Sequence, residues 1–420
     1  MESADPCRRR DTCRLCGGRD LTCVLALTPT PPANAFVGED AKDSAQPCFP
    51  LDVFFCETCN HVQLLDVVDP ALLFENYVYV SGTSPNFVKH FDDYAQALIK
   101  RFAPADGSLA VDIGSNDGTL LAAFQNRGMR GLGIDPARDI AARATEAGVE
   151  TIADFFSQAL ADRIKSERGP AAIVTANNVF AHADDLKGIV EGVRTLLAPD
   201  GVFAFEVSYL ADVVADTLFD TIYHEHLAYH SVKPLEAFFA ASGMRLFAVE
   251  RVPSHGGSIR GMACLASGAD EGPHTADGSV AALIASERDA GLDRAETFKT
   301  FAADINALGD QLKALIRDIK ADGKSIAGFG APAKATTLMY HFGIGADEID
   351  FIVDDSPLKQ GLYSPGAHIP VLASDALYER RPDYVLILAW NFAQAIIDKH
   401  SAFLDGGGRF IVPLPELKTF

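Results

Sequence analysis

The sequence contains no long apolar run. No stretch approaches the roughly 20 consecutive apolar residues that a membrane-spanning helix needs, so we expect no membrane partner. The first ten residues, Met1 to Arg10, include three arginines and lack the apolar segment of a secretory signal. Together these two absences predict a cytoplasmic protein.

Basic residues are also scarce. The chain has 36 Lys and Arg residues against 57 Asp and Glu residues, which gives a formal net charge of −21. A protein that binds the nucleic-acid backbone needs a basic face, so we expect no nucleic-acid partner, whereas a small-molecule substrate in a local pocket stays open. A length of 420 residues allows two or three domains. The acidic surface is compatible with a monomer or a weak dimer.

Cysteine is almost absent after residue 60, where only Cys264 occurs. The earlier part of the chain holds two Cys-x-x-Cys pairs, Cys13 with Cys16 and Cys56 with Cys59. Two such pairs in one short module predict tetrahedral Zn²⁺ coordination, and four thiolates would leave no position for water, so this zinc is structural. His61 is an alternative ligand, and disulfides are the alternative chemistry, which a reducing cytosol disfavours. We assign residues 1–75 to this zinc-binding module.

The first strand–turn–helix pattern lacks the Gly-x-Gly-x-x-Gly fingerprint of dinucleotide folds. Residues 109–113 form an apolar run, Gly114 and Gly118 lie in the turn, and the segment carries Asp112 and Asp117. Glycines let the backbone approach a ligand. Acids would repel a pyrophosphate but attract a sulfonium, so the pattern favours S-adenosylmethionine (SAM) over NAD. The next apolar run ends in Asp135, where a carboxylate can bind both ribose hydroxyls.

Strands and helices continue to alternate through the middle of the chain. Residues 150–156 read as a strand whose Asp154 and Phe155 would hold adenine, and residues 171–179 read as a strand that ends in two amides. Alternation of this kind predicts an α/β fold with a parallel sheet covered on both faces. The cofactor-binding residues that we predict are Asp112, Gly114, Asn116, Gly118, Asp135, Asp154, Phe155 and Asn177.

The segment Tyr223-His224-Glu225-His226 concentrates a phenol, two imidazoles and a carboxylate. Its histidines are two residues apart, whereas a zinc-protease helix needs them four apart. Histidine can accept or donate a proton near neutral pH, so we interpret the segment as a catalytic loop; a surface loop with chance polar residues is the alternative.

The last third, residues 271–420, reads as a second α/β unit. A long helix over residues 289–321 precedes a strand over 325–329 and a turn over 330–337 that contains Lys334. A loop-to-helix turn with a lysine suits phosphate, so we predict a Rossmann-like domain that binds a sugar nucleotide. A stabilising or dimer-forming lobe is the alternative.

Several of these motifs together resemble a known family. The chain is similar to class I methyltransferases and, in particular, to the zinc-containing sugar C-methyltransferases of deoxysugar biosynthesis. The resemblance covers nearly the whole chain and is most specific at the two Cys-x-x-Cys pairs and at segments 111–119, 220–226, 255–260 and 328–334. It implies a SAM-dependent methyltransferase core over residues 76–270. One departure is His230, where the family usually has an aromatic residue.

The resemblance also implies a reaction, which is methylation at C3 of a nucleotide-linked 4-keto-6-deoxyhexose through an enolate. His226 would be the base, Tyr223 or Tyr77 would donate to the C4 oxyanion, and Glu225 would orient the imidazole or bind the sugar. Substrate contacts are expected from Tyr79, Asn178, His255 and Lys334. Two alternatives stay open: O- or N-methylation of a sugar nucleotide or small metabolite, and a zinc scaffold without activity.

Overall fold

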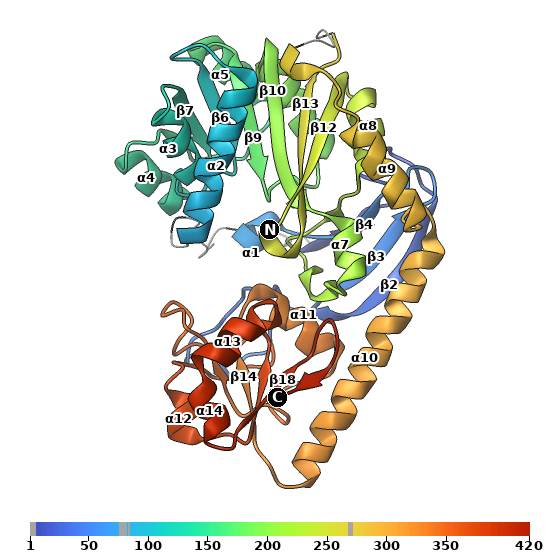
Figure 1. Cartoon of the computed structure of the whole chain (residues 1–420), viewed down its shortest axis with the longest axis vertical. Coiled ribbons are helices and arrows are strands. Elements are labelled where there is room, and N and C mark those ends of the chain that lie inside the picture. The colour runs from blue at the N-terminus through green and yellow to red at the C-terminus, as the bar shows by residue number, and fades with distance from the viewer. Residues whose placement is uncertain (1–5, 75–81, 83–84, 268–271) are drawn as a thin grey trace, which may run out of the picture.

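The computed structural model describes residues 6–74, 82, 85–267 and 272–420. Its N-terminal part is an antiparallel sheet with strand order β11-β4-β3-β2 (Figure 1). Its strands are β2 (Leu21–Thr30), β3 (Phe49–Cys56), β4 (Val62–Leu64) and β11 (Ala228–Tyr229). A two-stranded ribbon of β1 (Cys7–Arg9) and β5 (Asp66–Val68) lies beside it, and the short helix α1 (Pro70–Phe74) follows. Strand β11 is contributed by a distant segment, which follows the predicted catalytic loop.

The central part is a seven-stranded sheet with order β12-β13-β10-β9-β6-β7-β8. Five strands are parallel, namely β6 (Leu109–Ile113), β7 (Arg130–Ile134), β8 (Thr151–Ile152), β9 (Ala171–Asn177) and β10 (Leu197–Ser208). Strand β13 (Ser258–Leu265) is antiparallel to both of its neighbours, β10 and β12 (Met244–Val252). All five residues of β6 are buried, as expected for a parallel strand covered on both faces.

Helices cover both faces of this sheet (Figure 1). Ala110 of β6 packs with α2 (Pro85–Phe102) and α3 (Thr119–Gln125). Its neighbour Val111 packs on the opposite side with α5 (Gln158–Arg168), α6 (Leu186–Leu196) and α8 (Val232–Ala241), because successive strand side chains point to opposite faces. The helices α4 (Arg138–Glu146), α7 (Leu210–Ala215) and α9 (Ser279–Asp289) and the short turns η2 (Phe219–Thr221), η3 (Ser254–Gly256) and η4 (Gly272–His274) also belong to this part.

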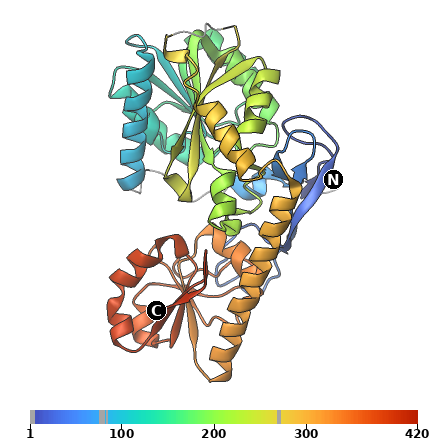
Figure 2. The same cartoon turned by 45° about the vertical axis from the view of Figure 1, so that its right-hand side comes forward.

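The 27-residue helix α10 (Ala295–Ala321) connects the central part to the C-terminal sheet (Figure 2). Its buried residues recur every three or four positions and form one apolar stripe: Phe298, Phe301, Ile305, Gly309, Leu312, Ile316 and Ile319. Phe298 packs on Phe55 of β3, with ring centroids 5.6 Å apart. One apolar cluster therefore continues from the N-terminal sheet through α10 into the C-terminal part.

The C-terminal sheet has six strands in the order β16-β15-β14-β17-β18-β19. The parallel strands are β14 (Ile326–Phe329), β15 (Ile352–Val353), β16 (Val371–Leu372), β17 (Tyr384–Ile387) and β18 (Arg409–Val412), and β19 (Lys418–Thr419) is antiparallel. Its helices are α11 (Ala333–His341), α12 (Ala376–Arg380), α13 (Ala393–Lys399), α14 (Ser401–Asp405) and the turn η5 (Trp390–Phe392).

The predicted α/β class is confirmed: a mainly parallel sheet covered by helices on both faces lies between a cysteine-bearing N-terminal module and a second α/β sheet. The predicted strand over 150–156 is shorter, because only Thr151 and Ile152 pair with β7. Among the described residues, no helix is long and apolar enough to cross a membrane.

Candidate active site

The four predicted zinc ligands lie together at the edge of the N-terminal sheet. Their Sγ atoms are all within 4.8 Å of one another, and Cys13–Cys59 and Cys16–Cys56 are each 3.6 Å apart. A tetrahedral ion with Zn–S bonds of about 2.3 Å would place its sulfur ligands roughly 3.8 Å apart, whereas a disulfide would need about 2.05 Å. The geometry fits a closed structural zinc site and excludes the disulfide alternative for these four cysteines.

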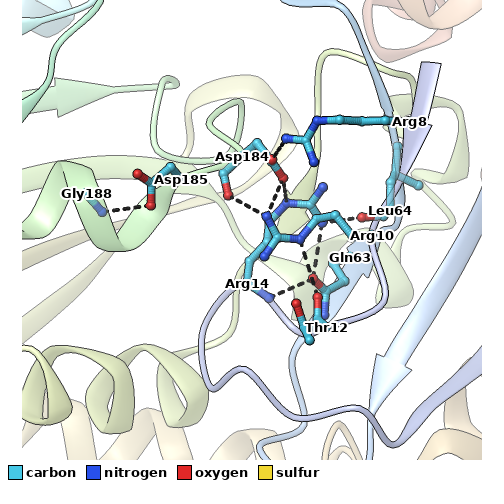
Figure 3. A network of polar contacts seen from close by, with 9 residues as sticks. All are labelled: Arg8, Arg10, Thr12, Arg14, Gln63, Leu64, Asp184, Asp185 and Gly188. Atoms are coloured by element: carbon cyan, nitrogen blue, oxygen red, sulfur yellow. Dashed lines mark hydrogen bonds and ion pairs between the residues drawn. The ribbon is translucent and has the colours of Figure 1, made fainter. Parts of the chain in front are cut away.

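The first cysteine pair also anchors a loop of the methyltransferase core (Figure 3). Arg14, whose side chain is buried, donates to Asp184 (Nε to Oδ1, 3.0 Å) and to the side chain of Gln63 (3.1 Å). Arg8 and Arg10 contact the same carboxylate. Burial lowers the pKa of Arg14 to about 10, so the guanidinium keeps its charge at neutral pH. The zinc module thereby holds the loop that follows β9.

The glycine loop after β6 has the backbone geometry of a ligand cradle. Gly114 has φ +70°, and a Cβ there would lie 2.2 Å from Cγ2 of Val179, so only glycine fits. Asp135 ends the neighbouring strand and accepts the backbone N–H groups of Asn116 (2.8 Å) and Ala137 (2.9 Å). Burial raises the pKa of Asp135, although these two bonds oppose the rise. The predicted ribose acid thus lies directly against the predicted glycine loop.

Two further polar side chains at this end of the sheet are buried. Asp112 accepts one hydrogen bond from Thr175 (Oγ1 to Oδ1, 2.6 Å), and burial raises its pKa to about 7. Neither amide atom of Asn177 has a hydrogen-bond partner among the described residues, although both are buried. Buried polar atoms are normally satisfied, so the Asn177 amide fits a site that a polar ligand completes.

Asp154 and Phe155 are exposed. Asp154 accepts the backbone N–H of Phe155 (2.8 Å), and the Phe155 side chain is 56% exposed. A large apolar ring on the surface next to the glycine-loop edge of the sheet is compatible with adenine stacking. Their adenine-binding role remains a prediction.

The Tyr-His-Glu-His segment brings His226 to the ends of β9 and β10. Its ring centroid lies 4.1 Å from that of Tyr223 and 4.8 Å from that of His182. Nδ1 of His226 is 2.7 Å from the carbonyl oxygen of Thr221. Because a carbonyl only accepts, Nδ1 carries the hydrogen, and the lone pair of the neutral ring is on Nε2. This is the tautomer that a base acting through Nε2 requires.

A small cleft borders this imidazole, with a cavity volume of about 20 Å³. Among the residues that line it are Asn178, His182, Ser208, Thr221, His226 and Tyr229. Clefts at the carboxyl ends of parallel strands are the usual ligand sites of α/β folds. His182 was not among the predicted catalytic or ligand-binding residues; the signal available was its place just after the strand that ends in Asn177.

The other two members of the segment point toward the N-terminal module. Glu225 accepts from the side-chain amide of Asn34 (2.8 Å), and burial raises its pKa to about 7. Nε2 of His224 lies 3.2 Å from the carbonyl oxygens of Phe49 and Pro50. Glu225 was expected either to orient the His226 imidazole or to bind the sugar. The group that contacts His226 Nδ1 is instead the Thr221 carbonyl.

The remaining substrate-binding predictions divide into three groups. Tyr77 and Tyr79 lie outside the described residues. The backbone of His255 lies in η3, and its side chain lies outside the described part. Lys334 is only 14% exposed, 3.8 Å from Asp220 and over the ring of Trp390, so its ammonium group is already paired within the protein.

Comparisons with known proteins show the family of the chain. Three family descriptions match the chain: a zinc binding domain at residues 13–74, a methyltransferase domain at 87–249 and a C-methyltransferase C-terminal domain at 253–415. C-methyltransferase NovU from Streptomyces niveus is 39% identical over 412 residues, which cover 98% of this chain and 97% of NovU.

Solved structures match less than half of the chain. A SAM-dependent methyltransferase from Clostridium acetobutylicum is 12% identical with a TM-score of 0.36 and covers 43% of this chain and 92% of its own. The PH0226 protein from Pyrococcus horikoshii is 16% identical with a TM-score of 0.37. This match covers 44% of this chain and 94% of PH0226. The domain matches and the full-length relative decide the assignment. The chain belongs to the zinc-containing, SAM-dependent C-methyltransferase family.

Proposed function

We propose that this enzyme transfers a methyl group from SAM to C3 of a nucleotide-linked 4-keto-6-deoxyhexose, in the biosynthesis of an unusual sugar. The observation that carries the proposal is the hydrogen bond between His226 Nδ1 and the Thr221 carbonyl, which makes Nε2 the basic nitrogen of an imidazole that lines the cleft. Methylation of carbon needs a base of this kind, because the carbon must first lose a proton. The relative NovU is a C-methyltransferase, which supports carbon as the acceptor.

The proposed reaction has two steps. Nε2 of His226 removes the proton from C3, and the C3–H electron pair becomes an enolate whose negative charge rests on the C4 oxygen. Tyr223, whose ring is tilted against that of His226, or Tyr77 donates a hydrogen bond to that oxygen. SAM would supply an electrophilic methyl group. As C3 of the enolate forms the new carbon–carbon bond, the sulfur–methyl bond breaks and S-adenosylhomocysteine leaves with that electron pair.

The cofactor would lie along the glycine-loop edge of the sheet. In this proposal Asp135 binds the ribose hydroxyls, Asp112 provides a negative charge toward the sulfonium, and Asn177 uses its unsatisfied amide. Gly114 and Gly118 keep the loop open, Asn116 lies beside Asp135, and Asp154 with Phe155 receives the adenine.

The sugar would bind at the cleft beside His226. Asn178, which lines the cleft, would contact the sugar, together with Tyr79 and His255. We propose domain limits of 1–75, 76–270 and 271–420 for the zinc module, the methyltransferase core and the C-terminal sugar-nucleotide domain.

Proton exchange tests the proposal without methyl transfer. The exchange of deuterium into C3 of a dTDP-4-keto-6-deoxyhexose is followed by NMR in heavy water, with S-adenosylhomocysteine in the donor site. The wild type is compared with His226→Asn. His368→Asn is the matched control, because His368 has φ +48°, which Asn tolerates, and it lies on a C-terminal loop.

We expect exchange in the wild type and in His368→Asn, and a loss of about 100-fold or more in His226→Asn. Equal exchange in His226→Asn would exclude His226 as the base. If a panel of keto-sugars shows no exchange while SAM still binds, carbon-acid chemistry is wrong and O- or N-methylation becomes the leading function.

A further inference from the structure

Helical elements of the C-terminal part contact the loop that carries His226. The turn η2 (Phe219–Thr221) lies against α11, the helix that follows the Gly330–Pro332 loop. The hydroxyl of Thr337 on α11 donates to the carbonyl of Ile222 (2.7 Å), and both Thr337 and Ile222 are buried. This hydrogen bond joins residues 115 positions apart in the chain.

A second set of contacts fixes Asp220, the residue that precedes Thr221. Asp220 is fully buried, and its Oδ2 accepts from Nε1 of Trp390 (2.6 Å) and lies 3.8 Å from Nζ of Lys334. The ammonium group of Lys334 also lies 4.1 Å from the centroid of the Trp390 ring. A buried carboxylate in contact with a lysine is costly to desolvate, and its best-attested use is to specify one arrangement of the chain.

Thr221 itself lies between these two fixed neighbours, and its carbonyl is the group that accepts from His226 Nδ1. The turn adds to this fixation, because the N–H of Thr221 donates to the carbonyl of Leu218 (3.0 Å). Asp220 and Ile222 each form a hydrogen bond with a helical element of the C-terminal part. The peptide group that contains the Thr221 carbonyl therefore has little freedom to rotate.

We infer that Thr337, Lys334 and Trp390 are positioning residues for the methyl-transfer reaction: they fix the Thr221 carbonyl, which sets the tautomer and orientation of the His226 imidazole. The inference rests on the base role proposed for His226. It gives Lys334 a task other than phosphate binding, which fits its 14% exposure. It also makes the C-terminal sheet part of the catalytic apparatus, although none of these three residues touches the reacting atoms.

Thr337→Val tests this inference because valine has nearly the shape of threonine and lacks the hydroxyl. Thr336→Val is the matched control: Thr336 is the preceding residue on α11, is also buried, and donates to a different segment, the carbonyl of Ala33 (3.1 Å). Both variants lose one buried hydrogen bond, so a general loss of stability affects them alike.

Two measurements separate positioning from stability. Imidazole ¹⁵N spectra of the full-length protein report the tautomer of each neutral histidine, and the His226 signals are identified by their absence from His226→Asn. Deuterium exchange at C3, measured over a range of keto-sugar concentrations with S-adenosylhomocysteine bound, separates the maximum rate from KM.

For Thr337→Val we expect the His226 signals to shift from the Nδ1–H form toward a mixture of tautomers. We also expect the maximum exchange rate to fall about tenfold while KM changes by less than about twofold. Thr336→Val should keep the wild-type tautomer and rate. Wild-type spectra and rates in Thr337→Val, or equal losses in both variants, would overturn the inference.

His226→Asn, measured alongside, distinguishes this failure from a failure of the proposed function. If His226→Asn exchanges as fast as the wild type, the base assignment is wrong, whatever Thr337→Val does. If His226→Asn is inactive and Thr337→Val behaves like the wild type, the base assignment stands and only the positioning role is wrong.

Discussion

Asp112 is a carboxylate whose ionisation is costly in the cofactor-free protein. Burial raises its pKa to about 7, and the single hydrogen bond from Thr175 opposes that rise only in part. An Asp in an unfolded chain has a pKa of about 3.9. Between these two values the native state binds the proton more tightly than the unfolded state, so this residue lowers stability progressively from about pH 4 to pH 7.

Asp112→Asn removes this pH dependence, because Asn has a similar shape and stays neutral. We expect the Tm of the wild type to fall relative to that of Asp112→Asn as the pH rises from 5 to 8, measured by thermal unfolding without SAM. SAM should bind the variant more weakly by calorimetry, since the variant lacks the carboxylate that we propose lies near the sulfonium. Asp304→Asn, exposed on α10, is the control. A Tm difference that does not change with pH would contradict the buried-charge explanation.

Among elements, the loop between β9 and α6 depends on a residue of the zinc module. Asp184 in this loop forms ion pairs with Arg8, Arg10 and the buried Arg14. It lies two residues after His182. Removing one partner of such a pair leaves buried charge without compensation. The loop that carries His182 is therefore held by contacts to a module more than 160 positions earlier in the chain.

Asp184→Asn should loosen this loop. We expect a loss of roughly 1–3 kcal/mol in the free energy of unfolding and faster amide hydrogen exchange over residues 178–186. Asp185→Asn is the control, because Asp185 caps α6 by accepting from Gly188 N–H (2.9 Å; Figure 3) and Asn caps helices equally well. Equal effects of the two substitutions would show that the Arg14 contact is not what holds the loop.

At the scale of the whole molecule, the zinc module, the core and the C-terminal sheet meet at one loop. His224 and Glu225 contact Phe49, Pro50 and Asn34 of the N-terminal part. Asp220 and Ile222, in the same loop, contact the C-terminal part. Loss of any of the three parts should therefore disturb His226.

Removal of zinc tests this dependence. We expect a chelator to release about one Zn²⁺ per chain, to lower Tm and to abolish C3 proton exchange, because the N-terminal sheet loses its staple. Cys56→Ser should reproduce these losses, and Cys48→Ser, an exposed cysteine outside the cluster, should not. A metal-depleted protein that keeps its Tm and its exchange rate would refute a structural role for the metal.

Local patterns in the sequence were sufficient to predict several parts of the site. The Cys-x-x-Cys pairs predicted a cluster that the structure brings together, because ligand spacing within each pair is a local property. Gly114 and Asp135 were both predicted to bind the cofactor because each follows a strand of a parallel sheet, and the structure places Asp135 in a hydrogen bond with the loop that follows Gly114. The fold class followed from the same alternation of strands and helices.

Local patterns could not predict the contacts between segments that are distant in the chain. The carbonyl that contacts His226 Nδ1 belongs to the backbone. Every residue has such a carbonyl, so the residue type of Thr221 could not predict this contact. Lys334 was predicted to face phosphate because its local turn suits an anion; the anion beside it is Asp220, brought there by the packing of α11 on η2. His182 approaches His226 only because the core loop and the catalytic loop are both fixed against the zinc module.

The sequence by itself determined the groups that can do chemistry here: four thiolates at metal spacing, a glycine loop with its acid, and a Tyr-His-Glu-His segment. These depend on residue type and on distances of a few positions along the chain. Only the tertiary structure decided how the groups are oriented, since Arg14 and Asp184, or Asp220 and Trp390, are each 170 positions apart. Contacts of that range form when buried apolar surfaces pack together, and packing of three parts on one loop places the His226 imidazole at the cleft.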